Sequence, residues 1–255
     1  MIKIKKPEEI EILKDGGKRH AFILRELKKM VAPGVTTQSL EDKARELIDE
    51  EGDKGAFLNY TPRGAKRAFP AALCVSINNE IVHGIPNEES RVLEEGDVVT
   101  LDLGLTHKGL ITDSAVTVAV GEVGENERKL IVHTEEALAR GIKEAQGGGF
   151  VGDISFAIGS FARSLGYGIP DSLAGHGVGY AVHEDPYVPN EGPAGKGERL
   201  VPGMVIAIEP MLTLGGDKIV LASDGYTYKT KDGSIAAHAE HTIVITETDP
   251  IILTK

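Results

Sequence analysis

The sequence predicts an α/β (α+β) chain built from two related halves, each with two helices followed by two strands. Apolar residues recur at the helical three-to-four-residue spacing in two pairs of segments. Runs of β-branched residues, bounded by Gly and charged residues, follow each pair. Short motifs of the first half also return in the second half in the same order. We therefore expect one domain over residues 1–255, with pseudo-repeats of roughly 1–121 and 122–255.

The first helix pair is bounded by helix-breaking residues. Helix one begins at Pro7, a favourable first helical residue, and its apolar pattern continues to Pro33-Gly34. Ser39 is a suitable N-cap for helix two, which ends at Glu51-Gly52. Both helices have apolar positions at helical spacing, and we expect those of helix two to face the core.

The second helix pair follows the same plan. Helix three spans about 125–146 and is broken by three consecutive glycines. Helix four follows Asp153 and ends before Gly166. The β-branched runs that follow the two helix pairs predict strands at 98–103, 115–120, 205–208 and 242–246.

Composition excludes several classes of protein. Lys and Arg number 28 against 39 Asp and Glu, a formal charge of −11, which argues against sequence-specific nucleic-acid binding. The single cysteine excludes an intramolecular disulfide and a Cys-rich zinc site. No apolar run approaches the roughly 18 residues that span a bilayer, and no signal peptide is recognisable. We expect a cytoplasmic protein without membrane contact.

The internal repeat carries ionisable residues in equivalent places. His83 in VHGIP matches His183 in VHEDP, since both motifs read V-H-x-x-P. Asp102 and Glu209 each follow a Gly turn and an apolar run, and Asp113 and Glu240 each precede one. A pseudo-twofold arrangement of the halves would bring the four carboxylates together.

Four carboxylates in one place predict a metal centre. Acids beside buried strands are costly unless they are paired or bound to metal, and four such charges need a counter-charge of several units. Two divalent cations would supply it. His176, in GHGVG, has no partner in the first half. Its glycine neighbours lack a Cβ and would let it approach a cation closely, and a nitrogen ligand favours a transition metal. His83 and His183 are expected on rim loops, where imidazoles contact substrate.

The combined motifs resemble those of the bacterial type I methionine aminopeptidases, over nearly the whole chain. The matching segments are VHGIP at 82–86, LDLG at 101–104, TDSA at 112–115, GHGVG at 175–179, VHEDP at 182–186, IEPM at 208–211 and AEHTIVIT at 239–246. The resemblance implies the pita-bread fold, in which two pseudo-twofold-related halves surround a central antiparallel sheet. It also implies removal of an N-terminal Met from a polypeptide by a metal-activated water.

The resemblance assigns a role to each site residue. Asp113 and Glu240 correspond to ligands that bridge two cations, and Glu209 to a ligand that also moves the proton. His183 corresponds to the oxyanion-stabilising histidine and His83 to the one that contacts the amide nitrogen. The full implied ligand set is Asp102, Asp113, His176, Glu209 and Glu240. The implied substrate-binding residues are His83, His183, Phe57, Tyr60, Cys74 and Tyr226.

Selectivity and partners are implied less directly. Val182 replaces an aromatic residue, and His238-Ala239 replaces an amide–aromatic pair, so the rim is expected to be more open than in the family. We expect cleavage before a small second residue, as in Met-Ala and Met-Gly, and not before Lys. The cations could be Co, Mn, Fe or Zn, since availability often decides occupancy. The resemblance also implies ribosome association, and we expect a monomer.

Two alternatives remain at this stage. An X-Pro aminopeptidase or prolidase uses the same five ligands on the same fold, but usually carries an additional N-terminal domain. A non-catalytic pita-bread binding protein would show lost ligands and a basic surface. Here all five positions are filled and the charge is −11.

Overall fold

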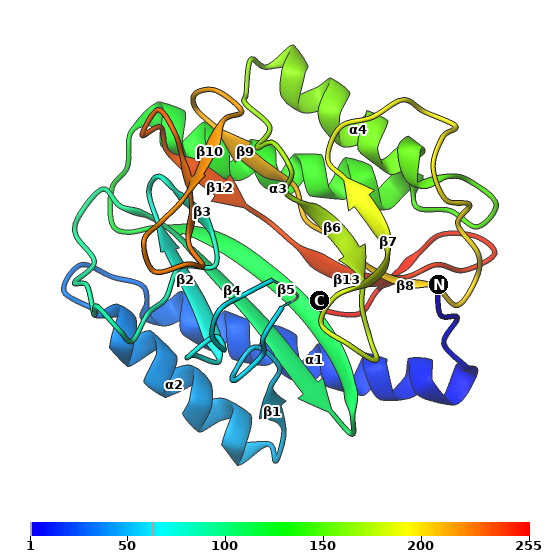
Figure 1. Cartoon of the computed structure of the whole chain (residues 1–255), viewed down its shortest axis with the longest axis horizontal. Helices are drawn as coiled ribbons and strands as arrows, with labels where there is room; N and C mark the ends of the chain where they lie inside the picture. Colours follow the sequence, from blue (N-terminus) through cyan, green and yellow to red (C-terminus); the bar gives the residue numbers. More distant parts are fainter. Residues whose placement is uncertain (1, 63) are drawn as a thin grey trace.

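The computed structural model describes residues 2–62 and 64–255. Within these residues lie four helices, which are α1 Pro7–Met30, α2 Thr37–Glu50, α3 Glu125–Glu144 and α4 Val151–Ser164. Antiparallel sheets lie between the two helix pairs (Figure 1). The mixed α/β class predicted from the sequence is therefore confirmed. None of the helices in the described ranges combines the length and the apolar character needed to cross a membrane.

The first-half strands are β1 Lys54–Gly55, β2 Leu73–Ile77, β3 Glu80–Val82, β4 Val98–His107 and β5 Leu110–Ala119. β4 and β5, each ten residues long, pair as an antiparallel hairpin. Its turn, Lys108-Gly109, has positive φ at both residues, which suits a tight hairpin. The predicted strands 98–103 and 115–120 were wrong in extent, because the hairpin continues to the pair His107–Leu110.

The second-half strands are β6 Ala174–Gly177, β7 Glu184–Pro189, β8 Val205–Ile208, β9 Met211–Thr213, β10 Ile219–Leu221, β11 Tyr228–Thr230, β12 Ala236–His238, β13 His241–Val244 and β14 Ile251–Ile252. Five of them form a sheet in the order β14-β13-β8-β6-β7. The predicted strand 205–208 is confirmed as β8, whereas 242–246 is displaced to β13.

Two predicted helix starts were wrong. The N-cap of α2 is Thr36, whose side chain accepts the Ser39 N–H at 3.1 Å, so Ser39 lies inside the first turn. α4 begins at Val151, before Asp153, because the Asp153 carboxylate accepts the Phe150 N–H at 2.8 Å. α3 ends at Glu144, two residues before the predicted boundary. Helix one matches its prediction, with Pro7 in the first turn.

A large cluster of buried apolar side chains lies beneath each helix pair. Leu27 and Leu40 pack with strand residue Leu101 in the first half. Leu138 and Ile154 belong to the corresponding cluster of the second half. Burying a side chain of this size contributes roughly 1.5–3 kcal/mol. Each cluster thus packs a helix pair against strands of its own half.

Candidate metal centre

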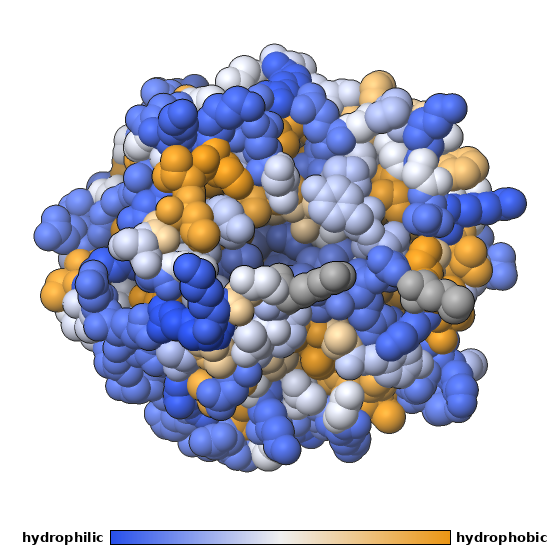
Figure 2. Space-filling model, in the orientation of Figure 1, coloured by the Kyte–Doolittle hydropathy of each residue, from blue (hydrophilic) through white to orange (hydrophobic). Residues whose placement is uncertain are grey.

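A pocket of about 870 Å³ is lined by residues of both halves of the chain. Figure 2 shows this face hollowed near its middle, with apolar and polar residues around the rim. The pocket is lined by all five residues predicted as metal ligands, Asp102, Asp113, His176, Glu209 and Glu240. Residues from both halves of the chain therefore contribute to one cavity.

Asp102 and Asp113 lie in the middle of β4 and β5, not at strand ends as expected. Asp102 pairs with Ala115, and Asp113 pairs with Gly104. Residues two apart on a strand point to the same face, so both carboxylates lie on one side of the hairpin. Gly104 is required here, because a Cβ would lie 2.5 Å from Cε1 of Phe57.

Glu240 is connected to β5 by hydroxyl groups as well as by the backbone. Its N–H donates to the Ala115 carbonyl at 3.0 Å, and the Ser114 hydroxyl donates to the Glu240 carbonyl at 2.7 Å. Thr242 makes two further bonds to the backbone of Asp113. These bonds cross from the first half to the second and fix the two acids relative to each other.

His176 lies on β6, whose glycines have a different role from the one expected. A Cβ on Gly175 would lie 2.3 Å from the Ala207 carbonyl oxygen, and one on Gly177 would lie 2.1 Å from that of Asp185. The glycines therefore allow close backbone packing between strands and do not clear space around a cation. The His176 Nδ1 lies 3.0 Å from the Gly177 carbonyl, so the proton is placed there and Nε2 faces the acids.

The acids are buried without a compensating cation among the described residues. Burial raises the pKa of Asp102 to about 7, and it raises the pKa values of Asp113, Glu209 and Glu240 well above their ordinary range. Repulsion between the carboxylates adds to the effect on Asp113 and Glu240. A divalent cation would remove this penalty.

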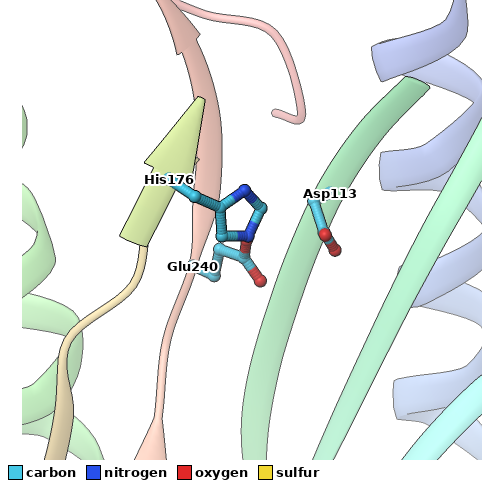
Figure 3. Close-up of side chains that lie close together, drawn as sticks. All are labelled: Asp113, His176 and Glu240. Atoms are coloured by element: carbon cyan, nitrogen blue, oxygen red, sulfur yellow. The ribbon is translucent and has the colours of Figure 1, made fainter. Parts of the chain in front are cut away.

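The donor set fits a divalent cation. Ligand atoms of Asp113, His176 and Glu240 all lie within 4.8 Å of one another. Figure 3 shows these side chains converging from β5, β6 and the segment before β13. Asp102 Oδ1, Asp113 Oδ1 and Glu240 Oε1 are buried without a hydrogen-bond partner in the described part of the chain. Hard oxygen donors with one imidazole suit Mn, Fe, Co or Zn.

His83 and His183 lie in loops, His83 directly after β3 and His183 directly before β7. His83 has a φ of 60°, and burial lowers its pKa to about 4. The Tyr60 hydroxyl lies 3.0 Å from Nδ1 of His183. The His183 ring lies 4.4 Å from that of His176, centroid to centroid. His183 is thus held beside the carboxylate cluster, and Tyr60 has an orienting contact that the sequence did not predict.

The four residues predicted for the side-chain pocket also line this cavity. Phe57, Cys74 and Tyr226 belong to one buried apolar cluster, against which Tyr60 packs. Burial raises the pKa of the Cys74 thiol well above its ordinary value. The Tyr226 hydroxyl donates to the Arg67 carbonyl. The wall is therefore apolar, and the hydroxyls of Tyr60 and Tyr226 are both paired.

His238 was assigned no role from the sequence, but the structure places it at the carboxylate cluster. Its Nε2 lies 3.6 Å from Glu209 and 3.8 Å from Glu240. Burial lowers its pKa to about 3, with His83 and His176 adding to the effect. A residue two positions before Glu240 on extended backbone shares its face, and this is the signal that could have revealed it. The other histidines, His20, His107, His133 and His241, bond to residues elsewhere.

The chain is similar to known proteins over its full length. Residues 11–247 match metallopeptidase family M24. A methionine aminopeptidase of Aquifex aeolicus is 45% identical over 100% of this chain and 99% of its own length. Methionine aminopeptidase 1 of Bacillus subtilis is 41% identical, with 100% of both chains covered.

Solved structures give the same result. The crystal structure of methionine aminopeptidase from Thermotoga maritima has a TM-score of 0.95 and 43% identity, covering 100% of both chains. The prolidase of Pyrococcus horikoshii has a TM-score of 0.76 at 22% identity, and the match covers 99% of this chain but 63% of that one. The second likeness concerns the fold alone.

Proposed function

The chain belongs to metallopeptidase family M24 and, within it, to the methionine aminopeptidases, and from this we infer that it removes the N-terminal Met of polypeptides. It is a metal-dependent hydrolase with the pita-bread fold, as the sequence resemblance implied. The X-Pro alternative is less favoured, because structures of that kind share only 22–24% identity with this chain. We propose the following roles for the residues of the pocket.

Five side chains are proposed to hold two divalent cations. They are Asp102, Asp113, His176, Glu209 and Glu240. When bound, the cations would supply Lewis acidity and lower the pKa of water. The chain's contribution is a fixed set of donors, since β4 and β5 hold Asp102 and Asp113 on one face of a hairpin. The buried carboxylate oxygens without hydrogen-bond partners support this assignment.

Glu209 is proposed to carry the proton that the reaction transfers. It lies directly after β8 in the pocket, and its Oε1 is 3.3 Å from Nε2 of His176. A carboxylate that faces the attacking water can accept its proton and then release it to the leaving group. Glu209 would take the proton of the attacking water and deliver it to the leaving amine nitrogen.

The two rim histidines are proposed to bind the scissile peptide bond. His183, oriented by the Tyr60 hydroxyl at 3.0 Å, would stabilise the charge that develops on the carbonyl oxygen. His83, whose carbonyl accepts from Thr227 Oγ1 at 3.3 Å, would contact the amide nitrogen. Preorganised contacts of this type lower the barrier without reorganisation during the reaction.

The substrate's methionine side chain is proposed to lie among Phe57, Tyr60, Cys74 and Tyr226. An apolar, polarisable wall suits a thioether, which makes favourable contacts with aromatic rings. These residues share one cluster. A small second residue would be preferred, so that Met-Ala and Met-Gly starts are cleaved and Met-Lys starts are not.

The observation that carries the function is the convergence of four carboxylates and His176 in one pocket. The test uses Met-Ala, Met-Lys and Xaa-Pro peptides with protein loaded with Mn, Fe, Co or Zn. We expect release of Met from Met-Ala, and at least a hundredfold loss in Glu209→Gln, of the order that loss of a proton-transfer group causes. Glu136→Gln, on the α3 surface, is the matched control. Full activity of Glu209→Gln, or preferential hydrolysis of Xaa-Pro peptides, would contradict the proposal.

We also propose that the protein acts in the cytoplasm as a monomer and meets its substrates as nascent chains at the ribosome. The bacterial relatives named as methionine aminopeptidases support a role in processing new polypeptides. Co-sedimentation with ribosomes carrying a nascent chain, together with light scattering of the purified protein, tests both statements. Failure to sediment, or a dimer mass, would refute the corresponding one.

A further inference from the structure

His238 is a buried histidine whose ring lies beside the carboxylate cluster. It lies at the end of β12 and is 1% exposed. Neither Nδ1 nor Nε2 has a hydrogen-bond partner among the described residues. An unpaired polar group in this environment costs about 1–3 kcal/mol. A residue kept at this cost suggests a function that the fold alone does not explain.

The ring of His238 faces the proposed proton carrier. Its Nε2 lies 3.6 Å from Oε2 of Glu209, while Nε2 of His176 lies 3.3 Å from Oε1 of the same carboxylate. Each oxygen of Glu209 therefore faces a different imidazole. The His238 Nε2 also lies 3.8 Å from Oε2 of Glu240. One ring is thus shared between two of the proposed cation ligands.

The backbone of His238 is fixed by Thr117 of β5. The Thr117 hydroxyl accepts the His238 N–H at 2.9 Å and donates to the His238 carbonyl at 2.7 Å. Thr100 lies 2.8 Å from the same hydroxyl and can donate to it. The backbone position of His238 is consequently fixed from the first half of the chain, and its ring lies beside Glu209.

His176 and His238 differ in whether the ring nitrogen that faces away from the acids has a hydrogen-bond partner. Histidines that bind metal almost always donate their second N–H to a partner. His176 has such a partner, the Gly177 carbonyl at 3.0 Å, whereas Nδ1 of His238 has none in the described ranges. His176 therefore fits a ligand, and His238 fits a residue that donates from Nε2 to a carboxylate.

We propose that His238 is a positioning residue of the cation centre, whose Nε2–H orients the carboxylates of Glu209 and Glu240. This inference rests on the proposed function in one respect, because both assume the same cation site. The present separations exceed the usual N–H···O limit of about 3.2 Å, so the bond requires a shift of about half an ångström in the Glu209 side chain. His238 in this role increases cation affinity without being a ligand.

The test measures cation binding without any peptide. Metal-free protein is titrated with Mn²⁺ by calorimetry for the parent, His238→Leu and His238→Gln. We expect His238→Leu to weaken binding about 10- to 100-fold, the usual effect of losing a residue that orients a ligand. His238→Gln keeps an N–H donor and should bind nearly as tightly as the parent. Equal loss in both variants, or no loss in His238→Leu, would overturn the proposal.

A second readout separates positioning from direct ligation. In the Zn²⁺-loaded protein, ¹⁵N NMR of the imidazole should show Nε2 of His238 protonated, and a metal-bound Nε2 would overturn the inference. His133→Leu, on α3 and bonded to Tyr167, is the control and should leave cation affinity unchanged. Circular dichroism of each metal-free variant reports whether it is folded. If the parent binds Mn²⁺ but does not cleave Met-Ala, the proposed function fails while the result for His238 stands.

Discussion

Thr242 and Asp113 form two reciprocal hydrogen bonds through one hydroxyl group. The Thr242 Oγ1 accepts the Asp113 N–H at 2.8 Å and donates to the Asp113 carbonyl at 2.7 Å. A side chain thereby replaces the strand partner that this part of β5 would otherwise need. It joins the two halves of the chain at a proposed cation ligand.

Replacing Thr242 with Val keeps the shape of the residue and removes both bonds. We expect a loss of about 2 kcal/mol in the free energy of unfolding, since two buried backbone groups lose their partner. Cation affinity should also fall about tenfold because Asp113 is no longer fixed. Urea denaturation and calorimetry measure the two effects. Thr246→Val also removes two bonds, but in an exposed turn, and should cost much less.

Lys5 and Glu184 form a buried ion pair of 2.7 Å, with side chains 1% and 6% exposed. Burial lowers the pKa of Lys5 despite the attraction of Glu184. Lys5→Met would leave the Glu184 charge without its partner, so we expect a loss of about 3–5 kcal/mol in unfolding free energy. The exposed pair of Lys14 and Glu11 provides the control, since Lys14→Met should cost less than about 1 kcal/mol.

The same pair is linked to the loop before His183, because Glu184 directly follows that histidine. Oε1 of Glu184 accepts the N–H groups of Tyr180 and Ala181 at 2.6 and 2.9 Å and so holds the loop before His183. The double variant Lys5→Met/Glu184→Gln removes the unpaired charge and should be more stable than Lys5→Met alone. A double variant that is less stable by the sum of the single effects would show that the two side chains are not coupled.

Burial of His20 should make the fold less stable as pH falls. It is fully buried on α1, and burial, with a smaller effect of His241, lowers its pKa from 6.5 to about 3. The unfolded chain therefore binds one more proton than the folded one between these values, and stability is lost as pH falls through this range. His20→Gln should reduce the slope of unfolding free energy against pH by about 1.4 kcal/mol per unit near pH 5. Parallel curves for the two proteins would argue against a neutral buried His20.

A substitution at Gly177 tests why glycines flank His176. Gly177→Ala would place a Cβ 2.1 Å from the Asp185 carbonyl oxygen, and we expect a loss of about 1–3 kcal/mol through overpacking. Weaker Mn²⁺ binding should accompany it, because β6 carries His176. Gly192→Ala, whose Cβ would lie 3.3 Å from Cβ of Ser155, is the control and should be tolerated. Unchanged cation affinity in Gly177→Ala would mean that His176 does not depend on this strand contact.

Local sequence signals predicted those features that depend on local chemistry. Pro7 sets the start of α1, since its ring favours the first helical turn. The cap of α2 was wrong because Thr36 and Ser39 can both cap, and only the geometry of the preceding bridge selects Thr36. Three-residue strands such as β9 and β12 are too short to show alternation and were not predicted.

The sequence predicted those site residues that recur in equivalent places of the internal repeat. His238 has no counterpart of that kind, and a histidine in an apolar run is ordinarily a core residue. Its position near Glu209 depends on the pairing of β12 with β9 and on the hydroxyl of Thr117, which lies far away in the sequence. The two-residue spacing to Glu240 indicates a shared face, whereas the contact with Glu209 follows from tertiary packing.

The packing of Leu253 against α1 has a consequence for synthesis of the protein. A Cβ on Gly17 would lie 2.2 Å from the carbonyl oxygen of Leu253. Leu253 also shares an apolar cluster with Leu13. Translation at about 5–20 residues per second places roughly 10–50 s between the emergence of these partners. The part of α1 around Leu13 and Gly17 lacks this cover throughout that interval. The final packing of this part of α1 therefore follows translation.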